Sequence, residues 1–181
     1  MKKVLSWIYI VLIGSIVSIA EPTWAKSLTG PQKNAVRSAK QYLSFSGFSR
    51  KGLIHQLSSD AGDGYKIDDA TIAVDSLDID WNKQAVRSAK HYLSFSGFSR
   101  KGLIRQLSSD AGDGYKVADA TVAVDSLDID WNKQAVRSAM DYLSFSGFSC
   151  AGLIEQLSSS AGDAYTKAQA AFGAQQTDAC Q

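Results

Sequence analysis

A block of about fifty residues occurs three times in this chain, and this repetition constrains the fold more than any other feature. The segment Asn-Ala-Val-Arg-Ser-Ala that begins at Asn34 returns with Gln84 and then Gln134 in its first position. Each copy continues through Tyr-Leu-Ser-Phe-Ser-Gly-Phe-Ser to Gly-Leu-Ile. A unit of this length cannot bury its apolar face alone, so repeats of fixed period stack on their neighbours. The sequence therefore predicts an array of small, similar units.

Within a unit the apolar residues follow helical spacing, and the second copy shows this clearly. Residues three and four apart predict a first helix, and they are Ala85, Val86, Ala89, Tyr92 and Leu93. Ser99 can cap a second helix, with Phe98 packing on Leu103 as a hydrophobic staple. After a polar turn, a further stripe predicts a third helix, and it comprises Val117, Ala120, Val124 and Leu127. The predicted fold class is all-α, a tandem array of three short three-helix, helix-turn-helix-like repeats.

The first 25 residues have the three parts of a secretory signal peptide: a basic start, an apolar run over residues 4–20 and a small-residue exit at residues 23–25. We expect cleavage after Ala25, with Ala20 as the second choice. The length of the apolar run leaves an uncleaved membrane anchor as the alternative. No cysteine lies near the exit to carry a lipid, so we expect no stable membrane anchor after cleavage. The protein is then periplasmic or secreted, in association with the cell envelope.

The charge of the exported part argues against a broad electrostatic partner. Removing residues 1–25 takes the nineteen basic and eighteen acidic residues to seventeen of each. A neutral chain lacks the excess of Lys and Arg with which proteins grip nucleic acid or anionic lipid. We therefore expect no nucleic-acid partner.

These patterns divide the chain into four parts. Residues 1–25 are the signal peptide, and residues 26–80 are repeat 1. Residues 81–130 are repeat 2. Residues 131–181 are repeat 3, with a tail that we expect a disulfide to hold.

Two tryptophans stand at the predicted junctions between units. Asp80-Trp81 and Asp130-Trp131 precede the first helix of the second and third units, whereas Gly30-Pro31 stands at the matching place before the first unit. The aspartate can cap the helix, and the tryptophan can wedge against the preceding unit. Because a tryptophan occurs only where a neighbour precedes, we interpret Trp81 and Trp131 as inter-repeat anchors rather than binding-site aromatics.

Both cysteines of the chain, Cys150 and Cys180, lie in the last unit. Cys150 takes the place of Arg50 and Arg100, and Cys180 lies in a tail that has lost the linker to a following unit. In an exported protein this pattern predicts a disulfide that ties down the tail in place of the missing inter-repeat contact. Free thiols, or a link between two molecules, are the alternatives.

The repeat motif also resembles a known family. Each unit reads Tyr-Leu-Ser-Phe-Ser-Gly-Phe-Ser and then Gly-Leu-Ile-x-Gln-Leu, and the first two units lead into Asp-Trp-Asn-Lys-Gln-Ala. From Gln32 to about Phe172 these motifs are similar to the repeat of the Ltp family of host cell surface-exposed lipoproteins. The resemblance implies small helix-turn-helix-like domains outside the cytoplasmic membrane. It also implies superinfection exclusion, in which the protein engages the incoming phage tape-measure protein and stops DNA injection.

Catalytic and metal sites find little support in the sequence. His55 and His91 occupy unrelated positions in their units and have no counterpart in the third, so a repeated triad or metal site would lack its base or ligand. The aspartates beside glycine lack the alternating ligands of an EF-hand, which favours turns over calcium; they are Asp60, Asp63, Asp110 and Asp113. We therefore expect no cofactor and no enzymatic activity.

The resulting hypothesis is an exported, monomeric, non-enzymatic protein that binds another protein, by resemblance a phage tape-measure protein. One alternative is a cell-envelope or peptidoglycan-binding module that meets an anionic wall polymer through basic residues on the second helices; these are Arg50, Lys51, Arg100, Lys101 and Arg105. A DNA-binding helix-turn-helix protein is the less favoured alternative. Recognition of the major groove would use the third helix of a unit. In the first two units that helix is acidic, through Asp68, Asp69, Asp75, Asp119 and Asp125.

Overall fold

The structure is a computed structural model that describes residues 27–181, so the expected signal peptide and its cleavage sites lie outside the described residues. Residues 27–181 contain nine helices and no strand. The helices are α1 (Gly30–Phe45), α2 (Arg50–Ser58), α3 (Ile67–Asp75), α4 (Trp81–Phe95), α5 (Arg100–Ser108), α6 (Val117–Asp125), α7 (Trp131–Phe145), α8 (Cys150–Ser158) and α9 (Lys167–Gln175). The predicted all-α fold of three three-helix repeats is confirmed.

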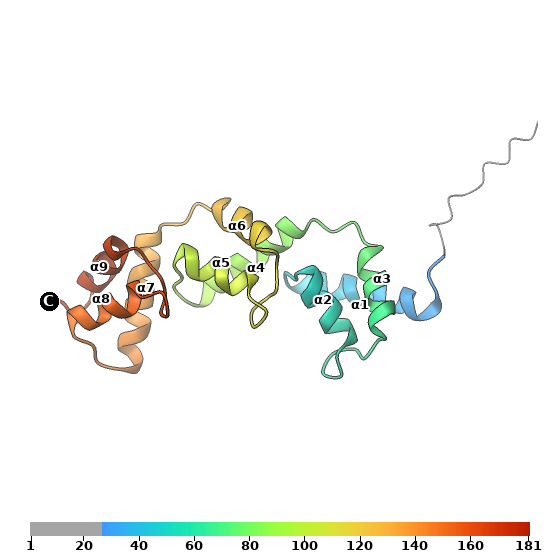
Figure 1. Ribbon diagram of the computed structural model, residues 1–181, viewed down its shortest axis with the longest axis horizontal. Coiled ribbons are helices and arrows are strands. Elements are labelled where there is room, and N and C mark those ends of the chain that lie inside the picture. Colours follow the sequence, from blue (N-terminus) through green and yellow to red (C-terminus); the bar gives the residue numbers. More distant parts are fainter. Residues whose placement is uncertain (1–26) are drawn as a thin grey trace, which may run out of the picture.

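Consecutive helices form three units: unit one is α1–α3, unit two is α4–α6 and unit three is α7–α9. Within each unit the third helix packs against both of the others. The three units lie in a row, so the described chain is elongated rather than built around one central core (Figure 1). Each unit therefore has its own core, as the repeat predicts.

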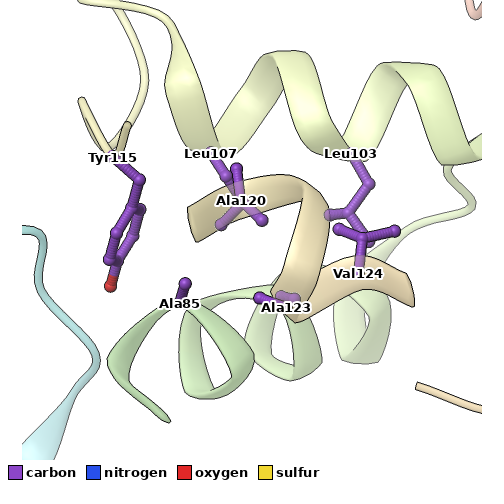
Figure 2. Packing of buried hydrophobic residues seen from close by; sticks show 8 residues of the cluster. Ala85, Leu103, Leu107, Tyr115, Ala120, Ala123 and Val124 are labelled. Carbon is purple, nitrogen blue, oxygen red and sulfur yellow. The ribbon is translucent and has the colours of Figure 1, made fainter. Parts of the chain in front are cut away.

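The core of unit two shows how so short a unit closes. Leu103 and Leu107 of α5 are completely buried, and Figure 2 shows Leu107 beside Ala120 and Leu103 beside Val124, both of α6. Alanines at the crossing points let the helices approach closely, while the leucines supply most of the buried apolar surface. Equivalent pairs of leucines are completely buried in the other two units, namely Leu53, Leu57, Leu153 and Leu157.

The helices begin where hydrogen-bonding side chains can cap them. Ser99 accepts the backbone N–H of Gly102 at the start of α5, as the sequence predicts. Asp80 accepts the N–H of Lys83 at the start of α4. The first helix has no aspartate there, and Thr29 forms a capping box with Gln32 instead.

Two residues of the predicted third-helix stripe differ from expectation. Val117 is exposed because it lies in the first turn of α6, ahead of the residues that enter the core. Leu127 does pack against the core of unit two, but it does so from the segment after α6, which ends at Asp125. Apolar spacing alone could not place this helix end, because the chain keeps covering the same core after the helix has stopped.

Candidate protein-docking surfaces at the repeat junctions

Trp81 and Trp131 lie at equivalent positions, each as the first residue of a unit's first helix. Trp81 packs against the core of unit one, and Trp131 packs against the core of unit two. Both rings are half-buried. Each tryptophan thus covers the unit that precedes it in the chain, which is the placement that the anchor hypothesis requires.

Cys150 and Cys180 are joined by a disulfide, with their Cα atoms 4.7 Å apart. The bond ties the first residue of α8 to the tail that follows α9. In unit one the equivalent of Cys150 is Arg50, whose guanidinium donates two hydrogen bonds of 2.6 Å to the carboxylate of Asp75. Arg100 and Asp125 form the same pair in unit two.

The disulfide therefore occupies the place of an ion pair inside the unit, which sequence reasoning did not identify. Gln175 stands where the partner aspartate would be, so an arginine at position 150 would have no carboxylate to bind there. Ala179 and Cys180 pack against the core of unit three, as Ile79 and Trp81 pack against the core of unit one. The disulfide thus replaces the ion pair and also holds the tail over the core of unit three.

Neighbouring units meet through a second set of contacts, made by the turn between the first and second helices. We call residues 46–49, 96–99 and 146–149 the leading turns. Ser49 Oγ donates a hydrogen bond to the backbone carbonyl of Asp113 in unit two, and Ser99 Oγ donates to that of Asp163 in unit three. Both serines are almost fully buried. They also cap their own helices, so one hydroxyl serves the unit and its junction together.

Glycine permits this close approach of the leading turn to the next unit. A Cβ on Gly47 would lie 2.6 Å from the carbonyl oxygen of Gln84, and a Cβ on Gly97 would lie 2.6 Å from that of Gln134. Neither distance is compatible with a side chain, so the first helix of the next unit rests directly on the turn. Among the described residues, no atom lies within 4 Å of a Cβ on Gly147, since unit three has no described successor.

The surface that receives the leading turn is the same in each following unit. We call it the receiving face, and in unit two it comprises Ser88, Tyr92, Asp113 and Tyr115. Tyr92 donates its hydroxyl to the Asp113 carboxylate at 2.7 Å, and the hydroxyls of Ser88 and Tyr115 lie 3.0 Å apart. Burial is the largest cause that raises the pKa of both Tyr92 and Tyr115, so both phenols remain neutral at physiological pH.

Basic residues complete the junctions, and each junction uses a different one on the second helix. Lys51 pairs with Asp110 at 2.6 Å in the first junction. In the second, Arg105 donates to the carbonyl oxygens of Ser160 and Gly162 at 3.0 and 2.8 Å. Both residues belong to the basic set that the envelope-binding alternative assigns to an anionic polymer. The signal for their junction role is that the third unit, which has no described successor, carries Ala151 and Glu155 at these positions.

The turn aspartates contribute to these networks. Asp63, Asp113 and Asp163 each accept a tyrosine hydroxyl through their carboxylates. Burial raises the pKa of Asp163. Residues 27–181 hold no group of three or more metal-binding side chains, and both histidines are exposed, with the His91 ring 4.8 Å from that of Phe95.

Each unit also carries an exposed phenylalanine at the end of its first helix. Phe45, Phe95 and Phe145 are 80%, 74% and 90% exposed. Sequence reasoning did not single them out, although the residue recurs in all three copies beyond the buried stripe. Aromatic side chains left in water at equivalent positions are typical anchors of protein interfaces.

Comparison with known proteins identifies the family. The model of the Ltp family, described as host cell surface-exposed lipoprotein, matches residues 31–77, 80–127 and 130–176. The chain belongs to this family. A solved structure with the same type of fold is that of Ltp, a superinfection exclusion protein from the Streptococcus thermophilus temperate phage TP-J34. The two chains are 35% identical with a TM-score of 0.51, over 56% of this chain and 99% of that one.

Comparison with curated protein sequences gave no match. The family model and the structural match confirm the Ltp resemblance that the sequence motifs predict. Within residues 27–181, no helix combines the length and the apolar character needed to cross a bilayer.

Proposed function

We propose that this protein acts in superinfection exclusion, as an exported, non-enzymatic protein that binds an incoming phage component. The observation that carries the proposal is the 35% identity to Ltp across 99% of that exclusion protein. The target that the family resemblance suggests is the tape-measure protein, and binding it would stop DNA injection after adsorption.

The exposed phenylalanines support a protein target. Each unit presents one ring at the end of its first helix, and burial of such rings drives protein association. The basic residues that would favour a wall polymer are partly engaged elsewhere, because Lys51 and Arg105 bind the following unit and Arg50 binds Asp75. This engagement favours a phage protein over an anionic envelope polymer.

The experiment compares phage adsorption with phage DNA entry in a sensitive host that expresses the protein. We expect DNA entry to fall while adsorption is unchanged. A variant with Phe45, Phe95 and Phe145 changed to Ser should fold normally, because these rings are exposed, and should lose protection and capture of purified tape-measure protein. Normal infection by a broad phage panel, together with binding to purified envelope fractions, would instead support the envelope-binding function.

Export is part of the proposal and has its own test. We propose that the signal peptide is removed after Ala25, which gives a mature protein that begins at Lys26. Mass spectrometry of the protein from envelope and secreted fractions should find this N-terminus. A protein that retains Met1 and stays in the membrane fraction would show that the segment is an anchor.

A further inference from the structure

The two ends of the described array carry complementary surfaces that are each left uncovered. In unit three the leading turn at residues 146–149 is largely exposed, whereas Ser49 and Ser99 in the other two turns are almost fully buried. In unit one the receiving face, Ser38, Tyr42, Asp63 and Tyr65, has no unit before it in the described chain. Tyr65 is accordingly half-buried, whereas Tyr115 and Tyr165 are only 3% exposed.

The uncovered surfaces are chemically the same as those that pair within the chain. Residues 146–149 read Ser-Gly-Phe-Ser, as do the two turns that dock, and unit one has the same Ser, Tyr, Asp and Tyr as the two faces that receive them. A hollow of about 160 Å³ on unit one is lined by Ser38, Gln41, Tyr42, Phe45 and Asp63. Their counterparts in unit three line a hollow that also contains Ser96 and Gly97 of the docked turn.

Unit one also has an arginine whose equivalents form hydrogen bonds across both junctions within the chain. Arg87 donates to the carbonyl oxygen of Leu43 across the first junction, and Arg137 donates to that of Leu93 across the second. The equivalent Arg37 is exposed and donates to Asn34 in its own helix. It could make the same bond to Leu143 of an incoming unit.

We propose that a second copy of this chain fills the receiving face of unit one with the leading turn of its unit three, so that copies associate head to tail. This goes beyond the proposed function and departs from the monomer expected from the sequence. The contact uses different surfaces on the two partners, so it does not close on itself after two copies and instead extends the row of units.

The association is weaker than the junctions within the chain for two reasons. Unit three has Ala151 and Glu155 where the other leading units have the cations that bind the next turn, and Glu155 would face backbone carbonyl oxygens. The internal junctions also gain from the covalent linker, which keeps their two halves at high effective concentration. Head-to-tail assembly therefore depends on protein concentration.

Sedimentation velocity over a concentration series tests the proposal with the purified, oxidised protein. We expect the sedimentation coefficient to rise with concentration past that of a dimer. The double variant Ala151→Lys, Glu155→Arg should restore both cations and associate at concentrations at least tenfold lower.

Gly147→Ala is the matched control, because nothing in the described structure approaches this position in the single molecule. Its thermal stability should be unchanged, but the added Cβ would clash with an incoming helix as it would at Gly47. We expect this variant to stay monomeric at every concentration. The proposal would be overturned if the wild-type protein stayed monomeric up to millimolar concentration, and the receiving face of unit one would then be left to another protein. Assembly that stops at a dimer would also overturn it. So would assembly that Gly147→Ala leaves intact.

Discussion

At the scale of single residues, the position after the turn aspartate has a left-handed backbone in all three units. Gly64 and Gly114 have φ angles of 68° and 67°, and Ala164 has a φ angle of 58°. Glycine takes this conformation freely, whereas a Cβ strains it. Unit three therefore carries a local strain that the other two units lack.

Replacing Ala164 with Gly should stabilise unit three by about 1 kcal/mol, because the strain of the left-handed alanine is relieved. Gly64→Ala is the matched reverse change, since nothing described lies within 4 Å of the added Cβ and strain is its main effect. Urea denaturation should show opposite shifts for the two variants. Equal midpoints for Ala164→Gly and wild type would contradict the prediction.

The Arg50–Asp75 pair predicts a pH dependence. Hydrogen bonds from Arg50 lower the pKa of Asp75 below its usual 3.8. Stabilisation from a lowered carboxyl pKa is complete above the unfolded value and is lost as the pH falls through the folded value. The side chains are about half exposed, so the contribution should stay below about 1 kcal/mol.

Asp75→Asn should therefore be less stable than wild type at pH 6, and the difference should shrink as the pH falls below 3.8 and through the lowered pKa of Asp75. The measurement is the urea midpoint of both proteins over this pH range. A difference of equal size at pH 2 and pH 6 would mean that the asparagine acts through packing rather than through the lost charge.

At the scale of elements, unit three uses a covalent bond where units one and two use an ion pair between their second and third helices. The Cys150–Cys180 bond closes a loop of 30 residues in sequence separation. In the chain-entropy description, such a loop contributes about 3 to 4 kcal/mol. Exposed ion pairs contribute far less to stability. Loss of the disulfide should therefore destabilise unit three more than loss of the ion pair destabilises unit one or unit two.

Mass analysis under non-reducing conditions should find a monomer lighter than the reduced form by two hydrogen atoms. Reduction should lower the unfolding midpoint of unit three, and Cys150→Ser with Cys180→Ser should reproduce that loss without reductant. Labelling of both thiols in the untreated protein, or a dimer that reductant separates, would refute the intramolecular bond.

Helical spacing and serine caps predict that each unit has three helices, because these signals are local, but they do not place the end of the third helix. The junctions could not be predicted in this way. Gly47, Gly97 and Gly147 have the same neighbours in sequence, yet the first two are pressed against the next unit and the third is open. Likewise, the partner of Arg50 lies on another helix, which no spacing within α2 reveals.

At the scale of the whole molecule, the two tryptophans are proposed to hold the row of units together. Trp81→Ala or Trp131→Ala should each cost about 2 kcal/mol, less than the 3 to 5 kcal/mol of a fully buried ring because each is half-buried. Thermal denaturation checks this, and Trp→Phe at either position should retain most of the stability. Unchanged melting in both alanine variants would show that the units are independent and that the rings serve another purpose.

Every unit carries a leading turn toward one neighbour and a receiving face toward the other, so each copy contains both halves of a junction. An in-frame duplication of residues 81–130 would therefore supply a complete new interface with no further mutation, and a deletion of the same block would rejoin compatible halves. Such a gene can lengthen or shorten its product in whole steps while every intermediate remains foldable. The near-identity of the first two copies in this chain is the expected result of such a duplication.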